Sequence, residues 1–309
     1  MINPLRGRRL AALPFLGLGI FTQCAPACVL EAPAAPVGIE DAATGEARTP
    51  KPHPPHPHAT TTTVALPPTT TAVTTTTTVR PGGSGYIPTL PVGAALPSDA
   101  TCAGRVRRMT ENRPLNAPFN ARRGTSPHDE YPRVTGNFTG TTDEIIQWAA
   151  CKHGLDTDWA RAQASIESWW RQNDSFGDFG TDPAGCLPGH PIGADGRPGE
   201  CPESVGLLQV RFPYHQGAFE DNNAILSTAY NADYAWQLWR DCYDGKVTWL
   251  NTVERGREYT AGDALGCMGV WFSGRWYTSA AVGYMNRVRD EFYAPRVWGQ
   301  SNFPPALPL

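Results

Sequence analysis

The sequence predicts one mainly helical globular domain that is stapled by disulfides and preceded by a disordered stalk. Three features predict this: the placement of tryptophan, the spacing of apolar residues and the number of cysteines. All ten Trp lie between Trp148 and Trp298, and the first hundred residues contain none. Because a packed core needs large apolar side chains, we expect the domain over residues 99–309, enough chain to bury a sizeable interior.

Apolar residues in this region recur at helical spacing. Thr141 and Glu144 match a capping box, in which a hydroxyl and a carboxylate satisfy free backbone N–H groups at a helix start. We expect that helix to end at Gly154 and the next one to be capped by Asp156. Further helices are predicted over 227–243 and 278–293, separated from the first two by an irregular Gly/Pro/Asp-rich loop.

That loop is expected over residues 175–203, and the chain lacks the strand–helix alternation of a parallel sheet. His153 stands near the end of the first predicted helix, where we expect it to contact terminal carbonyls. These features complete the prediction of a mainly helical class.

Six of the eight Cys fall in the tryptophan-rich region, and none forms a C-x-x-C pair or has zinc-finger histidines nearby. An even set of scattered cysteines behind an export signal predicts disulfides formed in an oxidising compartment. We favour pairing of Cys186 with Cys201 and of Cys242 with Cys267, although spacing alone leaves other connectivities open. The six are Cys102, Cys151, Cys186, Cys201, Cys242 and Cys267.

Residues 1–28 have the layout of a secretory signal peptide. Arginines precede a short apolar run over 10–21, and Ala25-Pro26-Ala27 resembles a cleavage site. The run is too short to span a bilayer, so we expect a secreted protein, with membrane attachment only if Cys28 is lipidated. Residues 29–98 are rich in Thr and Pro and cannot form a core, which predicts a disordered linker.

The composition argues against several function classes. Net charge is −3 and no basic stripe occurs, so nucleic acid is not an expected partner. The chain contains no G-x-S-x-G nucleophile motif, no phosphate-binding GxxxxGK[ST] string and no histidine pair at metalloprotease spacing. We therefore expect neither a cofactor nor a metal.

Glu167 is the candidate catalytic residue. On a helix it lies beside the apolar stripe, near Ala160, Ala164 and Trp170. Partial loss of hydration there is expected to raise the pKa of the carboxyl, as a general acid near neutral pH requires. The alternative is a surface glutamate paired with Arg171, worth about 0.3–0.5 kcal/mol, and periodicity alone favours it.

A second motif reverses that preference. The string Ser204-Val205-Gly206-Leu207-Leu208-Gln209 offers a tight turn at Gly206 and an amide at Gln209 that can bond sugar hydroxyls. Together with Glu167-Ser168 at a helix end, it resembles the E-S and S-x-G-L-M/L-Q motifs of the soluble lytic transglycosylases and goose-type lysozymes. Tyr284-x-x-Arg287 looks like the closing helix of that family, and the resemblance covers residues 141–293.

The resemblance implies a lysozyme-like α+β fold and a secreted, cell-wall-associated bacterial enzyme that acts as a monomer on peptidoglycan strands. It would cleave the β-1,4 bond between N-acetylmuramic acid and N-acetylglucosamine. Glu167 would protonate the glycosidic oxygen and then, as base, help the muramoyl 6-hydroxyl form a 1,6-anhydro sugar. Ser204, Gln209 and Tyr284 would contact the substrate.

The chain departs from the family at its A-x-Y-N segment. Ala229-Tyr230-Asn231 comes too early, so we expect Asn231 and Asp233 to serve helix packing or capping. At the expected distance stands a segment over 269–277 that holds Trp271, Ser273 and Trp276. Trp271 and Ser273 are candidate glycan contacts, while each tryptophan is about equally compatible with a place in the core.

A second catalytic carboxylate, which most glycosidases use, has no recognisable position. This favours a transglycosylase, because its substrate supplies the nucleophile. Two alternatives remain open: a muramidase that uses water, and a wall-glycan-binding module without turnover. The acidic candidates that a hydrolase could use are Glu203, Asp174, Asp178 and Asp182.

Overall fold

The computed structural model describes residues 87–305 except 126, 174 and 196. The predicted signal peptide, Cys28 and the linker up to residue 86 lie outside the described residues. The described part is mainly helical and contains three disulfides, as predicted. None of its helices is both long enough and apolar enough to cross a membrane.

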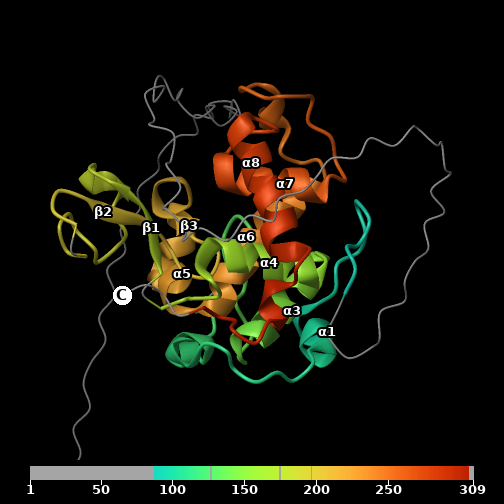
Figure 1. The fold of residues 1–309 in the computed structure, drawn as a ribbon, viewed down its shortest axis with the longest axis horizontal. Helices are drawn as coiled ribbons and strands as arrows, with labels where there is room; N and C mark the ends of the chain where they lie inside the picture. The colour runs from blue at the N-terminus through green and yellow to red at the C-terminus, as the bar shows by residue number, and fades with distance from the viewer. Residues whose placement is uncertain (1–86, 126, 174, 196, 306–309) are drawn as a thin grey trace, which may run out of the picture. The chain divides into compact units, whose positions relative to one another are not determined.

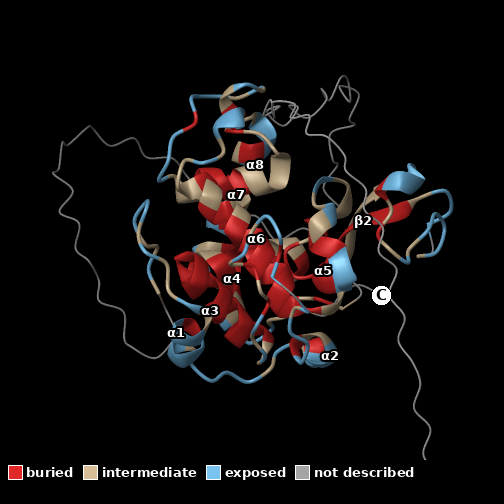
Figure 2. Ribbon diagram, turned by 180° about the vertical axis from the view of Figure 1, so that it is seen from behind, coloured by how far each residue is buried: buried red, intermediate tan, exposed pale blue. Residues whose placement is uncertain are grey.

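Three helices form the buried centre of the domain: α3 (Thr142–His153), α4 (Thr157–Ser168) and α6 (Thr228–Tyr243) (Figures 1 and 2). Helix α3 begins with the predicted capping box and ends at Gly154 in the left-handed conformation. Asp156 caps α4, as predicted, through the backbone N–H groups of the first turn. The residues next to each helix end thus determine where α3 stops and where α4 starts.

Helix α4 ends directly after the Glu167-Ser168 motif. Trp169 takes the left-handed conformation at its C-cap, and Trp170 follows with a positive φ before turning its ring into the core. The indole N–H of Trp170 donates to the carbonyl of Arg161, which fixes the chain reversal. Glu167 therefore lies in the last turn of a mostly buried helix, directly before this chain reversal.

Helices α7 (Ala264–Ser273) and α8 (Ser279–Arg287) pack against each other at the top of Figure 1, and α8 continues as one π-helical segment, Val288–Tyr293. The π-helical segment packs against α4, where the rings of Tyr293 and Trp159 stack 3.7 Å apart. The predicted helices over 227–243 and 278–293 are confirmed, the second with this change of pitch.

The predicted loop over 175–203 is wrong in part, because its ends form a sheet. Strands β1 (Phe176–Gly180), β2 (Cys201–Val205) and β3 (Val210–Arg211) pair antiparallel in that order. Gly177 lies opposite Ser204, and a Cβ there would approach the Gln209 amide oxygen to 2.5 Å. Glycine is thus required by packing in β1, although the same composition is typical of loops.

Shorter elements surround these layers. Residues 87–98, the end of the predicted linker, run along the helices: Leu90 donates to the carbonyl of Gly154, and Arg240 donates to the carbonyls of Leu90 and Pro91. The last part of the predicted linker thus contributes to the packing of the domain. The remaining helices are α1 (Asp99–Arg105), α2 (Ala117–Asn120), α5 (Asn223–Leu226) and the 3₁₀ turns Pro114–Asn116, Pro183–Gly185, Phe212–Tyr214, Gln216–Asn222, Thr248–Asn251 and Val297–Gly299.

The described residues contain three disulfides, which close loops of different length. Cys186–Cys201 and Cys242–Cys267 are the predicted pairs, and Cys102–Cys151 joins α1 to α3. The last closes the longest loop, with a sequence separation of 49 against 15 for Cys186–Cys201. Each bridge restricts the unfolded chain more than the folded one.

Replacing Cys102 and Cys151 together by Ala should lower the free energy of unfolding by about 4 kcal/mol, against about 3 kcal/mol for the Cys186/Cys201 pair, because the longer loop loses more closure entropy. Chemical denaturation of the two double variants measures this. Equal stability of wild type and the Cys102/Cys151 variant would contradict the expectation.

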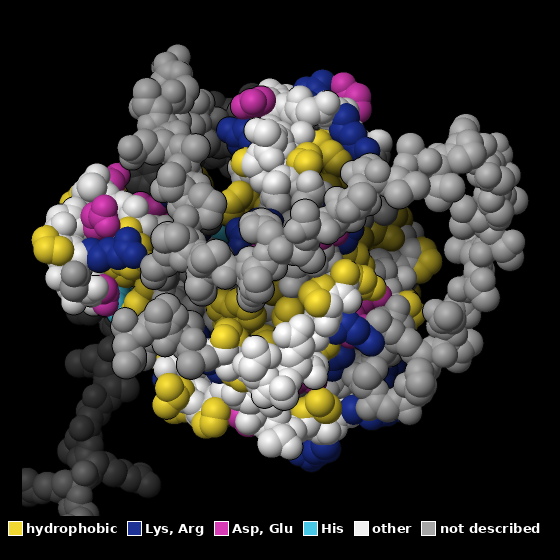
Figure 3. Space-filling model, in the orientation of Figure 1, with side chains coloured by type: hydrophobic (Ala, Val, Ile, Leu, Met, Phe, Trp, Pro, Cys, Tyr) yellow, Lys and Arg dark blue, Asp and Glu magenta, His cyan; other side chains and the backbone are white. Residues whose placement is uncertain are grey.

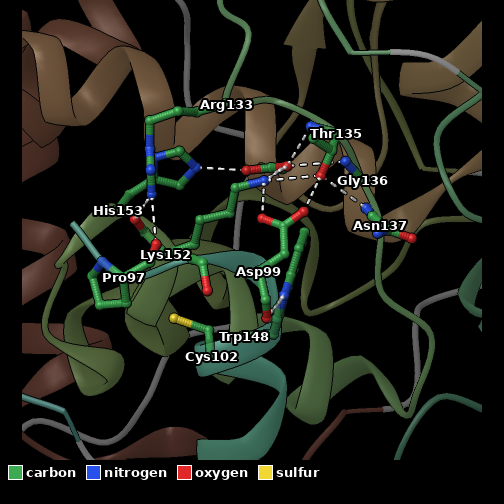
Figure 4. Close-up of polar contacts among 12 residues, drawn as sticks. Pro97, Asp99, Cys102, Arg133, Thr135, Gly136, Asn137, Trp148, Lys152 and His153 are labelled. Carbon is green, nitrogen blue, oxygen red and sulfur yellow. Dashed lines mark hydrogen bonds and ion pairs between the residues drawn. The ribbon is translucent and has the colours of Figure 1, made fainter.

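A buried charge network ties α6 to α3 (Figure 4). The fully buried carboxylate of Asp233 lies 2.7 Å from the Lys152 ammonium and 2.6 Å from Nε2 of His153, and it accepts the backbone N–H groups of Thr135 and Gly136. His153 therefore contacts a carboxylate, not the helix-terminal carbonyls that the sequence suggested. Burial opposes the charge of Asp233, but the bonds and charges of His153 and Lys152 outweigh it and lower the carboxyl pKa.

Asp233→Asn should destabilise the fold by about 3 kcal/mol, because it removes the buried charge beside Lys152 and His153, although Asp99 remains 2.8 Å from the Lys152 ammonium. Urea denaturation checks this value. The matched control is Glu258→Gln, which removes a carboxylate from the exposed pair with Arg255 and should cost no more than about 1 kcal/mol. Similar losses in the two variants would show that burial of the pair carries no special weight.

Candidate functional site

Glu167 lies half-buried in the last turn of α4, and Tyr284 of α8 reaches it from a distant part of the chain. The Tyr284 hydroxyl donates a hydrogen bond to Oε1 of Glu167 at 2.5 Å. Tyr284 itself is only 4% exposed. The structure therefore brings together two residues that the sequence proposed separately, as acid and as substrate contact.

The environment of Tyr284 keeps its hydroxyl a donor. Burial raises its pKa well above the ordinary value, and the negative charge and hydrogen bond of Glu167 raise it further. The ring of Phe272, from α7, stacks on Tyr284 with centroids 4.7 Å apart and planes 7° from parallel. Tyr284 is thus held protonated and in one orientation beside the carboxylate.

The two motifs meet through the residue after Glu167. The Ser168 hydroxyl donates to the carbonyl of Leu207 at 2.8 Å, so the end of α4 is bonded to the turn at residues 206–209. Asn231 of α6 accepts the Leu208 N–H and donates to the carbonyl of Val205. Asn231 thus holds the motif turn, in line with its expected structural role.

Gly206 allows this close approach. Its φ is +85°, and a Cβ would lie 2.6 Å from the Asn231 amide nitrogen and 2.7 Å from the Gln172 amide. Gln172 in turn accepts the N–H of Leu207. A side chain at position 206 would therefore displace the groups that hold the turn.

Ser204 and Gln209 bond to each other. The Ser204 hydroxyl is fully buried and donates to Oε1 of Gln209 at 2.9 Å, while the Gln209 amide donates to Ser175 and to the Gly206 carbonyl. Gln209 is partly exposed and has a φ of +54°. The structure therefore places Ser204 behind Gln209, and only Gln209 of the two reaches the surface.

The aromatic segment over 269–277 contributes one tryptophan to this region and one to the core. Trp271 is half-buried, donates its indole N–H to the carbonyl of Leu208 and stacks on His215 at 11°. Trp276 is fully buried and donates to the carbonyl of Glu258. The Ser273 hydroxyl donates to the Gly269 carbonyl at the end of α7, so its bonding is internal to the helix terminus.

The acidic residues considered as second carboxylates have structural partners where the structure describes them. Glu203 pairs with Arg211 beside a hollow of about 300 Å³, and Asp182 caps a short 3₁₀ turn at the same hollow. Asp178 sits in β1 with a positive φ, and Asp174 lies outside the described residues. Acidic and basic side chains are gathered over this hairpin in Figure 3.

A comparison of the chain with protein-family models, curated proteins and solved structures found no match. A function must therefore be inferred from the motifs and the geometry of the site.

No sequence pattern assigned a role to two neighbours of the Glu167–Tyr284 pair. Gln163 stands one turn before Glu167 on the same helix face, and its side chain is a hydrogen-bonding neighbour of the Tyr284 hydroxyl that lowers its pKa. The spacing was visible, but it did not show which distant residue Gln163 would meet. Phe272 likewise gave no signal beyond belonging to an aromatic segment.

The half-buried imidazole of His215 predicts a pH dependence of stability. Burial lowers its pKa to about 4, against 6.5 in the unfolded chain, and the Tyr234 hydroxyl lies 3.2 Å from its Nδ1. As pH falls from 6.5 to 4 the unfolded state takes up the proton first, so the folded state should lose up to about 3 kcal/mol.

His215→Gln should flatten the stability profile in that window, as measured by denaturation at several pH values. His190→Gln, which changes a partly exposed imidazole beside Asp195, is the matched control. An unchanged slope in the His215 variant would show that another group titrates.

Proposed function

We propose that this protein is a secreted bacterial lytic transglycosylase with a lysozyme-like fold, acting on peptidoglycan with Glu167 as its general acid and base. The observation that carries the proposal is the half-buried Glu167 carboxyl at the end of α4, which receives the hydroxyl of Tyr284. The bond from Ser168 to the S-x-G-L-L-Q turn places the two motifs next to each other, as the proposed site requires.

In the proposed reaction Glu167 gives its proton to the glycosidic oxygen as the bond to the muramoyl anomeric carbon breaks. The resulting carboxylate then takes the proton of the muramoyl 6-hydroxyl while that oxygen bonds the anomeric carbon. The products are a free 4-hydroxyl and a 1,6-anhydro end, and Glu167 is protonated again. Tyr284 holds the carboxyl in place through both proton transfers.

The partners of the other acidic residues support a mechanism with one carboxylate. Glu203 is engaged by Arg211, and Asp182 caps its own turn. Most glycoside hydrolases use a second group to activate water or to act as nucleophile, whereas a transglycosylase uses the substrate hydroxyl. The structural roles of Glu203 and Asp182 therefore favour the transglycosylase over the muramidase.

Glycan contacts are proposed at Gln209 and Trp271, both partly exposed and both bonded to the motif turn. The second lone pair of the Gln209 amide oxygen would accept a bond from a sugar hydroxyl or N-acetyl N–H, and the Trp271 ring would cover an apolar sugar face. Ser204 and Ser273 would act indirectly, by fixing Gln209 and the end of α7. The three disulfides are compatible with a secreted protein, and cell-wall association is part of the proposal.

Glu167→Gln should abolish cleavage of purified peptidoglycan, at least about 100-fold, because an amide cannot supply the proton. Mass spectrometry of the soluble fragments measures turnover. Glu203→Gln, which removes the Arg211-paired carboxylate, is the matched control and should keep most of the activity. Full activity of the Glu167 variant would refute its role as acid.

The masses of the wild-type products decide among the candidate functions. Fragments with 1,6-anhydro ends support the transglycosylase. Reducing ends, heavier by one water, would instead establish a muramidase, and binding without fragments would establish a non-catalytic glycan-binding module.

A further inference from the structure

We propose that Gln163 is a positioning residue which, oriented by the indole of Trp236, sets the direction of a buried hydrogen-bond chain that ends on Glu167. This inference rests on the proposed enzymatic role of Glu167, and it assigns a task to a buried amide that the sequence motifs do not include.

The chain of hydrogen bonds joins three helices. Trp236 of α6 donates its Nε1–H to Oε1 of Gln163 on α4 at 3.0 Å. The Gln163 side chain is also a hydrogen-bonding neighbour of the Tyr284 hydroxyl of α8 and lowers its pKa, and that hydroxyl donates to Glu167 at 2.5 Å. Trp236, Gln163 and Tyr284 are 0%, 1% and 4% exposed, so bulk water does not compete for these bonds.

The direction of the chain follows from donor chemistry. An indole N–H can only donate, so the group of Gln163 that faces Trp236 must be its oxygen. The amide NH₂ is then the group left to bond Tyr284, and it can only donate to the phenolic oxygen. With that oxygen accepting, the hydroxyl hydrogen of Tyr284 points to Glu167. Donation therefore runs in the order Trp236→Gln163→Tyr284→Glu167, and the opposite order is not possible because the indole N–H of Trp236 cannot accept a hydrogen bond.

A buried amide at this position calls for a reason. An aliphatic side chain would fill the same space between helices without the cost of burying a polar group. Gln163 instead accepts from Trp236 through its oxygen, and its NH₂, turned toward the Tyr284 hydroxyl, makes that hydroxyl a stronger donor. The Tyr284 hydroxyl restrains the orientation of the Glu167 carboxyl and stabilises the carboxylate that forms once Glu167 has given its proton to the glycosidic oxygen.

The charged groups near this series of hydrogen bonds can be named. Arg287 of α8 and Glu167 itself influence Tyr284 electrostatically, and Arg171 follows Glu167 by one turn. On the elements packed against α4, several charged side chains form ion pairs of their own. These pairs are Asp143–Arg161, Asp158–Arg296, Lys152–Asp233, Arg287–Glu291 and Arg289–Asp290, and Glu144 bonds the capping box and Met109.

The test is Gln163→Met, which keeps the side-chain length and removes the amide. We expect kcat/KM on peptidoglycan to fall roughly 10- to 100-fold, because the carboxyl is less well placed. Weaker donation to the carboxylate also favours the protonated acid, so the limb on which activity is lost with rising pH should move to higher pH. A purely structural role for Gln163 would leave that limb in place.

A double-mutant cycle with Tyr284→Phe tests whether Gln163 acts through the Tyr284 hydroxyl or through the stability of the fold. Once the hydroxyl is gone, adding Gln163→Met should cause little further loss, because both changes interrupt the same chain. Additive losses, or an unshifted pH limb in the single variant, would overturn the proposal. Neither result would touch the proposed function, which stands or falls with Glu167→Gln.

Trp236→Phe supplies an independent test should the Gln163 variant fold poorly. It removes the donor that orients the amide and should move the same pH limb in the same direction. The matched control is Trp239→Phe, which deletes another buried indole N–H on α6, one bonded to the Ala264 carbonyl. Equal pH profiles for the two variants would show that the Trp236 bond has no directing role.

Discussion

Helix α6 is the element on which the remaining arrangement depends, because its buried polar side chains must find partners on other elements. Buried polar groups are costly without hydrogen bonds, so each one fixes a neighbour in position. Asn231 binds the motif turn, Asp233 binds Lys152 and His153 of α3, and Trp236 binds Gln163 of α4. One helix thereby orients a loop and two helices.

This constraint explains why the proposed site is built mainly from helices. Glu167 is carried by α4, whose place is set from α6 through Gln163 and Trp236. Tyr284 is carried by α8, which is held by the stack on Phe272 and by its own bond to Glu167. A carboxyl supported in this way needs little reorganisation during proton transfer, which is where electrostatic preorganisation contributes to a reaction rate.

The small sheet has a different task, which is to bring Gln209 to the surface with its amide already oriented. Gly177 of β1 leaves room for the Ser204–Gln209 pair, and the disulfide Cys186–Cys201 ties the hairpin loop to β2. Strand β1 therefore has no side chain at Gly177, and the Gln209 amide occupies the space that such a side chain would fill. The glycines of β1 are also the reason why the sequence predicted a loop there, because the residues that pack against them are distant in the sequence.

The sequence by itself determined the features that depend on near neighbours in the chain. The capping box of Thr141 and Glu144, the stop at Gly154 and the class of fold all follow from spacing over a few residues. Two of the three disulfides could also be anticipated, since each closes a short loop.

Only the tertiary structure decided which distant groups meet. His153 found Asp233 in place of terminal carbonyls, Ser204 turned inward to Gln209, and Tyr284 reached Glu167 together with Gln163. Partner choice for a buried polar group is set by how whole helices pack, and that packing sums many weak contacts along the chain. A short sequence pattern does not reveal this packing. The sequence could therefore propose the residues around Glu167, but it could not show which of them contact each other.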